Sequence, residues 1–247
     1  MPTLAPALPV SRPAPSQEID DPSVSFVGRS LGEYTQSLGL DPVALRGRDV
    51  LDVAAGPSSF TAEACARKID AVAVDPLYDR PLAELAARAQ ADHERSFAGL
   101  RARRRLIRSR TFASLGAAEV EREGAARRFL ADYETHFIHN RYVAGSLPQL
   151  PFFDGTFDLV LCAHLLFTSA AQFDFDWHLS ALRELMRVSA GEVRIHPLGG
   201  PDGKPYPGLA RLRRELREHG IAAEVRAVDY EFLAGSNSML VLRRKAT

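Results

Sequence analysis

The sequence predicts an α/β fold whose sheet is mostly parallel. Short segments rich in β-branched and apolar residues alternate with helical segments along most of the 247 residues, and this alternation is typical of parallel strands joined by crossover helices. The composition, 46% hydrophobic and 25% charged, is sufficient for one domain with a buried core. Because the formal net charge is zero, no general attraction of the whole molecule to nucleic acid or to an anionic membrane is expected.

Residues 1–22 differ from the rest of the chain. They contain six prolines and no continuous apolar segment, which predicts a disordered tail rather than a signal peptide. The folded domain is therefore expected over residues 23–247. No apolar run reaches membrane-spanning length, and Cys65 and Cys162 form no disulfide framework. We expect a cytoplasmic protein that does not contact a membrane.

The order of elements begins with a short amphipathic helix, since Leu31, Tyr34, Leu38 and Leu40 lie roughly on one helical face. Short apolar or β-rich segments separated by helical ones then predict five strands, namely Asp49–Ala54, Asp70–Val74, Arg141–Ala144, Phe157–Ala163 and Glu192–Pro197.

The C-terminal part of the sequence has a different pattern. An amphipathic helix over residues 209–220 precedes two strand-like segments, 222–232 and 239–244, which only the short turn "AGSNS" separates. Strands joined by so short a turn must be antiparallel neighbours. The sheet is therefore expected to end in a hairpin.

The connection between the second and third strands is unusually long. A whole strand–helix–strand unit needs about 30 residues, whereas 66 residues, 75–140, separate these two strands alone. We expect a helical insertion at about residues 82–138, with an apolar stripe of Ala125, Phe129, Tyr133 and Phe137 packed on the domain. Its arginine-rich run, Arg101–Arg110, is consistent with RNA binding or with a solvated helix face paired with nearby glutamates.

The stretch "VLDVAAGPSSF" places a small-residue turn directly after the first strand. In an open α/β sheet the ligand approaches the backbone at this turn, but the dinucleotide fingerprint needs three glycines, and here only Gly56 is one. Asp52 would also repel a pyrophosphate, whereas it would attract the ammonium and sulfonium groups of S-adenosylmethionine. A nicotinamide cofactor, S-adenosylmethionine and a turn without a ligand remain three alternatives at this point.

A second carboxylate ends the next strand. Asp75 follows Asp52 by 23 residues, a distance at which an acidic residue can accept hydrogen bonds from both hydroxyls of an adenosine ribose. This role does not distinguish the two cofactors, because both contain that ribose.

Four blocks in this order, "VLDVAAGPSSF", "VAVDP", "LPQLPFFDGTFDLVLCAHLLF" and "ALRELMRVSAGEVRIHP", resemble the class I S-adenosylmethionine-dependent methyltransferases, in particular the type-11 group. The resemblance covers about residues 48–244. It implies a Rossmann-like, mostly parallel seven-stranded sheet with a C-terminal antiparallel hairpin and helices on both faces. It also implies S-adenosyl-L-methionine as cofactor and methyl transfer by in-line displacement. The acceptor is unidentified, and "CAHLLF" favours a small molecule because it lacks the Asn/Asp-Pro-Pro-aromatic run of enzymes that methylate bases or glutamine.

The same resemblance assigns site residues. It implies that the methionine part of the donor lies against Asp52, Ala54 and Gly56, the ribose against Asp75, the adenine against Ser146 and Leu147, and the methyl group and acceptor against Ala163 and His164. Ala54 and Ser58 replace glycines that are usual in the family, and Ser146 replaces an acidic residue.

His164 and His196 are the candidate catalytic bases, because each ends a strand at the expected ligand edge. No metal is expected, since no third ligand accompanies the two histidines. Two alternatives are kept. One is an NAD(P)-dependent oxidoreductase, and the other is a donor-binding or RNA-binding module without catalysis, which the altered turn and the arginine run would explain. The sequence leaves the oligomeric state open.

Overall fold

The computed structural model describes residues 24–108 and 110–245. The tail expected at residues 1–22 lies outside them. In the described part, the strands are β1 (Asp49–Val53), β2 (Asp70–Asp75), β3 (Tyr142–Ala144), β4 (Phe157–Ala163), β5 (Ser189–His196), β6 (Ile221–Ala227) and β7 (Ser238–Arg244).

These strands form one sheet in the order β3-β2-β1-β4-β5-β7-β6. β1 pairs in parallel with both β2 and β4, and Leu51 lies opposite Val72 on one side and Val160 on the other. β7 is antiparallel to both β5 and β6. The predicted fold class, a mostly parallel seven-stranded sheet that ends in an antiparallel hairpin, is confirmed.

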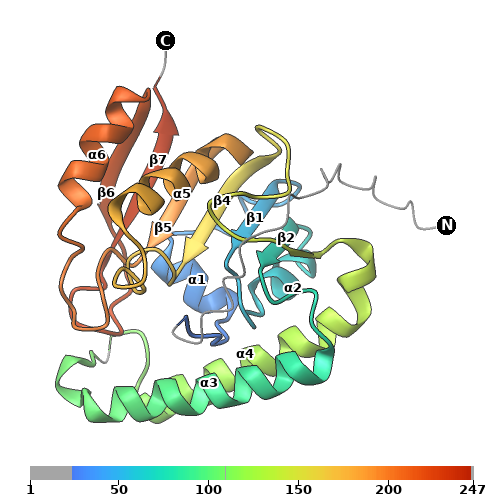
Figure 1. The fold of residues 1–247 in the computed structure, drawn as a ribbon. Helices are drawn as coiled ribbons and strands as arrows, with labels where there is room; N and C mark the ends of the chain where they lie inside the picture. The colour runs from blue at the N-terminus through green and yellow to red at the C-terminus, as the bar shows by residue number, and fades with distance from the viewer. Residues whose placement is uncertain (1–23, 109, 246–247) are drawn as a thin grey trace.

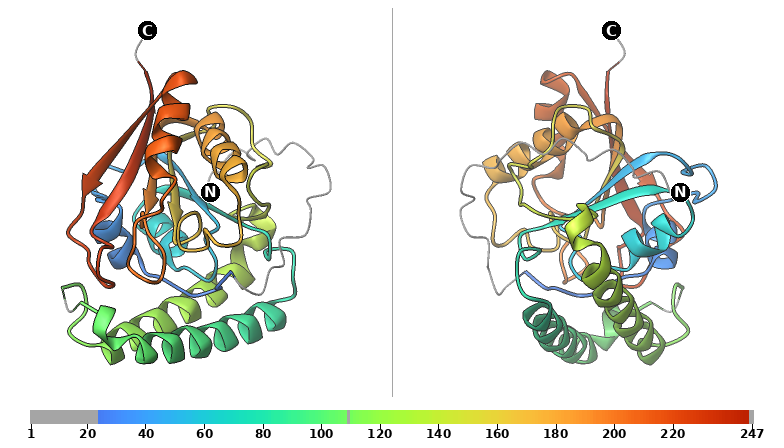
Figure 2. Two further views of the ribbon diagram at one scale, coloured as in Figure 1. Left: turned by 60° about the vertical axis from the view of Figure 1, so that its left-hand side comes forward. Right: turned by 90° about the vertical axis from the view of Figure 1, so that its right-hand side faces the viewer.

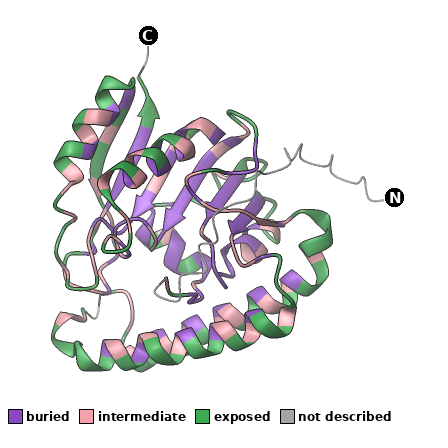
Figure 3. Ribbon diagram, in the orientation of Figure 1, coloured by how far each residue is buried: buried purple, intermediate pink, exposed green. Residues whose placement is uncertain are grey.

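Helices cover both faces of the sheet (Figure 1). On one face α5 (Phe175–Val188) and α6 (Leu209–Glu218) bury leucines against the central strands. On the other face lie α1 (Leu31–Ser37) and α2 (Phe60–Cys65), whose apolar side chains pack on Val50 and Leu161. The strands between the two layers are buried along most of their length (Figure 3), as expected for parallel strands covered on both faces.

Two long antiparallel helices fill the insertion, α3 (Leu82–Ala102) and α4 (Leu115–His136). They run side by side across the end of the sheet at which the parallel strands finish (Figures 1 and 2). The expected stripe on α4 is buried at its first three positions, but Phe137 is 38% exposed because α4 ends at His136. A short 3-10 helix, Phe137–His139, follows.

The last hairpin differs from the expectation in one respect. β6 ends at Ala227, so the prediction that a strand continues to Phe232 is wrong. Tyr230 and Phe232 instead leave the sheet and are buried against Phe97 of α3. The Phe232 carbonyl accepts a hydrogen bond from the Arg108 N–H at 2.9 Å. Burial of two aromatic rings against the insertion thus competes with strand pairing and ends β6 early.

The arginine run is also not one helix face. α3 ends at Ala102, and a single 3-10 turn, Arg104–Leu106, follows before the chain becomes extended. Arg101 pairs with Glu119 at 2.5 Å, as the solvated-face interpretation predicts. Arg110 lies 3.8 Å from Glu231.

A buried ionic network joins the insertion to the rest of the domain. Arg122 of α4 forms a bidentate pair with Glu33 of α1, with nitrogen–oxygen distances of 2.6 and 3.1 Å. The Tyr230 hydroxyl donates a third hydrogen bond to Glu33 at 2.7 Å, and the Arg122 guanidinium lies 4.4 Å from the centre of the Phe232 ring. Burial alone would raise the pKa of Glu33, but Arg122 and Arg29 lower it below its usual value.

Breaking this network should destabilise the protein strongly. Arg122→Met leaves the Glu33 carboxylate buried without its main partner, and we expect the free energy of unfolding to fall by about 3–5 kcal/mol. Arg127→Met removes an exposed ion pair with Glu123 on the same helix. This substitution should change the free energy of unfolding by less than about 1 kcal/mol. Urea denaturation measures both, and equal effects of the two substitutions would show that the network contributes no special stability.

No helix within residues 24–108 or 110–245 is long and apolar enough to cross a membrane.

Candidate functional site

A cavity of about 850 Å³, open to solvent, lies where the first four strands of the sheet end. Its walls come from the ends of β1, β2 and β4 and from the loop after β3. The segment Val24–Arg29, which we call the N-terminal strap, closes another side together with Phe173 and Trp177. Ligands of open α/β sheets bind at this position.

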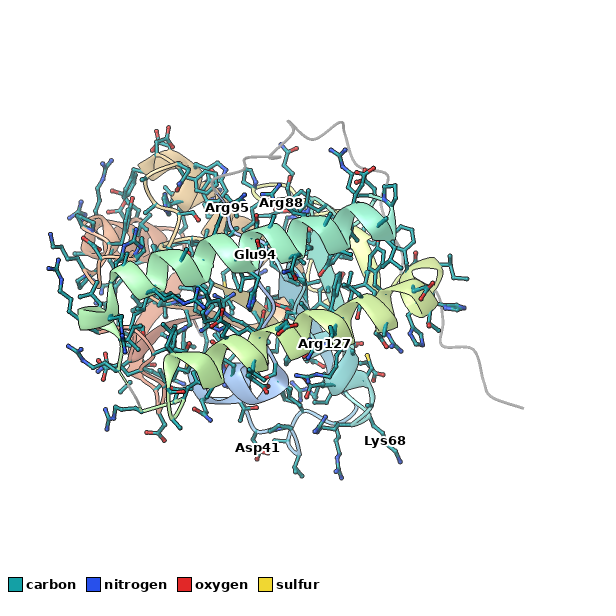
Figure 4. The ribbon with its side chains drawn as sticks, turned by 90° about the horizontal axis from the view of Figure 1, so that it is seen from below. Asp41, Lys68, Arg88, Glu94, Arg95 and Arg127 are labelled. Atoms are coloured by element: carbon teal, nitrogen blue, oxygen red, sulfur yellow. The ribbon has the colours of Figure 1, made fainter. Side chains whose placement is uncertain are left out.

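The N-terminal strap is held by the two insertion helices. The Phe26 N–H donates to Asp92 of α3 at 2.7 Å, and Arg88 donates to the Val24 carbonyl at 3.2 Å. Figure 4 shows α3 and α4 from below, with Arg88 and Arg95 labelled on α3, and both arginines also pair with Asp92. A Cβ on Gly28 would lie 2.7 Å from the Pro57 carbonyl oxygen and 2.8 Å from the backbone nitrogen of Ala126. The strap therefore passes tightly between α4 and the turn that follows β1.

The turn after β1 carries two residues in the left-handed region, Ala54 with φ of 53° and Gly56 with φ of 56°. Several of its backbone N–H groups already donate hydrogen bonds within the protein. The Gly56 N–H donates to Asp75 at 3.0 Å, and the Ser59 N–H donates to the Arg29 carbonyl at 2.9 Å. The Ser58 hydroxyl also donates to that carbonyl, at 2.7 Å, and accepts from the Phe60 N–H at 3.2 Å.

Ala54 gives a prediction about stability. An L-residue other than glycine is strained at positive φ. Lys68, with φ of 64°, is strained in the same way but lies outside the cavity lining. Ala54→Gly and Lys68→Gly should each raise the free energy of unfolding by up to about 1 kcal/mol. Thermal unfolding measures the effect. A lower stability of both variants would mean that the left-handed residues are not strained.

Asp75 lies at the end of β2 and lines the cavity. One carboxylate oxygen accepts from the Gly56 N–H and the other from the Leu77 N–H, both at 3.0 Å. A carboxylate has about four lone-pair sites, so each oxygen can accept one further hydrogen bond. Burial raises the pKa of Asp75 to about 6, although both backbone donors and Arg88 oppose that shift.

Asp52 is buried below the turn and is not among the residues that line the cavity. Its Oδ1 accepts from the Tyr34 hydroxyl at 3.1 Å, and its Oδ2 is buried without a hydrogen-bond partner. Burial raises the pKa of this carboxyl well above its usual value. The orphaned oxygen is thus an acceptor for a ligand donor or for water.

The structure brings most of the other expected site residues to the cavity. Ala54, Gly56, Ser146, Leu147 and Ala163 all line it. Leu147 is almost completely buried, as expected for a wall residue.

The two candidate bases are placed differently. His164 lines the cavity with φ of 59°, and its Nε2 is buried without a partner. His196 lies behind it, with ring centres 5.4 Å apart, and its Nε2 lies 2.8 Å from the Ser236 carbonyl oxygen. Burial lowers the pKa of His196 to about 4, and burial with the nearby Arg29 charge lowers that of His164 well below its usual value. Both imidazoles are therefore neutral at pH 7, and of the two only His164 lines the cavity.

Sequence reasoning missed Arg29, Arg88 and the stacked pair Phe173 and Trp177, whose ring centres are 3.7 Å apart. The available signal for Arg29 was its place just before the helix-capping residue Ser30. Within the described ranges, no group of three or more His, Cys, Asp or Glu residues could hold a metal ion.

The strand order, with five parallel strands followed by an antiparallel β7 inserted between β5 and β6, decides the fold type. The chain has the class I methyltransferase fold. In this structure the cavity lies at the ends of β1 and β2, where the turn after β1 and Asp75 meet.

No family model matches the sequence. It is 27% identical over 222 residues to the uncharacterized protein MJ0045 of Methanocaldococcus jannaschii, an alignment that covers 89% of this chain and 96% of that protein. Among solved structures, it is similar to a TehB-like SAM-dependent methyltransferase from Corynebacterium glutamicum, with 17% identity, a TM-score of 0.47 and coverage of 86% of this chain and 88% of that one. It is also similar to the 1,6-didemethyltoxoflavin-N1-methyltransferase of Burkholderia thailandensis, with 17% identity, a TM-score of 0.47 and coverage of 87% and 79%.

Proposed function

We propose that the protein transfers the methyl group of S-adenosylmethionine to a small-molecule acceptor by in-line displacement. The observation that carries the proposal is that backbone N–H groups of the turn between β1 and α2 are already hydrogen-bonded within the protein. A dinucleotide needs free N–H groups at this helix N-terminus for its pyrophosphate. Here the N–H groups of Gly56, Ser59 and Phe60 already donate to Asp75, Arg29 and Ser58.

The same turn is compatible with a donor that carries no phosphate. Asp75 retains acceptor capacity for two ribose hydroxyls, and the orphaned Oδ2 of Asp52 supports a role for this carboxylate near an ammonium group. Ser146 and Leu147 are the residues that would contact the adenine, and Ala54, Gly56 and Ala163 would line the path to the reacting methyl group. The fit of these residues favours S-adenosylmethionine over a nicotinamide cofactor.

When bound, the sulfonium supplies an electrophilic methyl group that needs no further activation. The contribution of the protein is then positioning and the exclusion of water. The N-terminal strap lines the cavity and is held in place by α3 and α4, an arrangement that suits both tasks. For an acceptor that must lose a proton, His164 is the group in this cavity that would accept it, because its imidazole is neutral and lines the same wall as Ala163.

The walls of the cavity favour a small acceptor. Besides the strand ends, they include the N-terminal strap and the aromatic side chains of Phe173 and Trp177. A macromolecular acceptor would have to reach past the strap, which Asp92 and Arg88 hold against α3.

A crystal structure with S-adenosylhomocysteine tests the proposal. We expect the ribose hydroxyls within hydrogen-bond distance of Asp75 and the sulfur between the turn after β1 and the end of β4. Density for the nucleoside in any other place on the molecule would contradict it.

A second candidate function is RNA binding through Arg101–Arg110. Arg103, Arg104 and Arg105 are exposed, and they form no ion pair with any residue that the structure describes. Three free guanidinium groups at the tip of the insertion favour contact with a phosphate backbone. Fluorescence anisotropy with a labelled single-stranded RNA should then detect binding that weakens steeply with added salt. Substituting all three arginines with glutamine should abolish it, whereas binding insensitive to salt and to these substitutions would contradict this function.

A further inference from the structure

Arg29 is the charged residue of the cavity wall whose side chain has the fewest partners. Its backbone carbonyl is fixed by Ser58 and Ser59, so the origin of the side chain is rigidly placed. Its Nη1 donates to the Val27 carbonyl at 3.2 Å. Its Nε is buried without a hydrogen-bond partner, and no residue in the described ranges accepts a hydrogen bond from its Nη2.

Glu33 is the nearest carboxylate, but other groups already occupy it. The Arg29 Nε lies 3.6 Å from Glu33 Oε1 without a hydrogen bond. That oxygen accepts from Arg122 at 2.6 Å and from Tyr230 at 2.7 Å, and Oε2 accepts from Arg122 at 3.1 Å. One negative charge is therefore shared between two guanidinium groups, and the bidentate pair with Arg122 leaves the charge of Arg29 largely uncompensated.

The other neighbours of Arg29 do not supply a counter-charge. His164, beside it in the cavity wall, is a neutral imidazole. Asp52 forms no hydrogen bond with Arg29, because its Oδ1 accepts from Tyr34 and its Oδ2 is buried without a partner. A partly buried guanidinium on a cavity wall, whose nearest carboxylate is mostly engaged by other groups, favours an anionic group on the ligand.

We propose that Arg29 forms a carboxylate-binding subsite in this cavity. The inference rests on the proposed function for the identity of the ligands. Two ligands could carry the carboxylate: the amino-acid part of the donor, or the methyl acceptor. The planar guanidinium suits bidentate recognition of either one.

The test compares wild-type protein with Arg29→Gln, Arg29→Lys and a surface control, Arg127→Gln, from the exposed face of α4 (Figure 4). Calorimetry measures the binding of S-adenosylhomocysteine and of 5′-methylthioadenosine, which has the same nucleoside but no amino-acid carboxylate. A second set of titrations adds benzoate, or its neutral isostere benzamide, to protein saturated with S-adenosylhomocysteine. Benzoate is chosen because the Phe173–Trp177 pair offers an aromatic surface in the same cavity.

If the donor carries the carboxylate, Arg29→Gln should weaken S-adenosylhomocysteine by about 10- to 100-fold and leave 5′-methylthioadenosine unchanged. If the acceptor carries it, Arg29→Gln should leave both nucleosides unchanged and weaken benzoate by a similar factor, with no such effect on benzamide. Arg29→Lys should retain part of the affinity in either case, because it keeps the charge. Arg127→Gln should match wild type throughout.

Unchanged binding of all ligands by Arg29→Gln, or an equal loss for the two nucleosides, would overturn the subsite. Thermal unfolding of each variant identifies a loss of folding, and Arg29→Lys then carries the comparison. Failure of the wild-type protein to bind either nucleoside would contradict the proposed function instead. In that case benzoate binding to the free protein, and its loss in Arg29→Gln, still tests the subsite by itself.

Discussion

Asp75→Ala is expected to weaken the binding of S-adenosylhomocysteine by on the order of 2–3 kcal/mol, or roughly 30- to 160-fold. The substitution removes the acceptor of two ribose hydroxyls and leaves those hydroxyls without their protein partner. It also frees the Gly56 and Leu77 N–H groups that hold the turn. Calorimetric titration of the variant measures the loss.

Asp70→Ala is the matched control, because Asp70 begins the same strand and is exposed at the opposite end of the sheet. This variant should bind like wild type. Unchanged affinity of Asp75→Ala would refute the role of Asp75, and an equal loss in both variants would indicate a general weakening of β2.

The same carboxylate predicts a pH dependence. Its pKa in the free protein is raised to about 6, and a hydroxyl donor binds the ionised form better than the protonated form. Affinity for S-adenosylhomocysteine should therefore be constant well above pH 6 and fall as the pH drops through that value. The decline should be absent in Asp75→Asn, which cannot ionise. A decline of the same size in that variant would assign the titration to another group.

His164→Asn is expected to lower turnover by about 10²–10⁴-fold once an acceptor that must lose a proton is in hand. Asparagine tolerates the left-handed backbone that His164 adopts at φ of 59°, so the fold should be kept while the proton acceptor is lost. Donor affinity should stay within a few-fold of wild type. Steady-state kinetics and calorimetry on the same preparation measure the two quantities.

The control for His164 is His93→Asn, on α3 outside the cavity lining. It should leave both turnover and donor affinity unchanged. Near-normal turnover of His164→Asn would leave positioning and exclusion of water as the sole source of acceleration. A loss of donor affinity as large as the loss of turnover would instead indicate a structural role for the ring.

The parts of the fold that depend on local pattern could be predicted from the sequence. Each strand of the parallel sheet is a short apolar segment between helical ones, so Asp75 at the end of β2 was identifiable from its place in the pattern. The hairpin was also identifiable, but the end of β6 was not. The local sequence around Tyr230 and Phe232 is typical of a strand. Their side chains are instead buried against α3, a contact that depends on tertiary packing.

The strap is the part of the site that sequence reasoning could not reach. Its position depends on Asp92, far along the chain, and on the absence of a side chain at Gly28 between two other elements. No local periodicity links these positions. Arg29 reaches the cavity only because its carbonyl is bound by the turn after β1, and this contact is set by tertiary packing.

The identity of the cofactor is the central claim, and calorimetric titration of the wild-type protein with S-adenosylhomocysteine and, separately, with NADH tests it most directly. The engaged N–H groups of the turn after β1 predict saturable binding of S-adenosylhomocysteine and no measurable binding of NADH. Binding of NADH with none of S-adenosylhomocysteine would contradict the account and indicate an oxidoreductase.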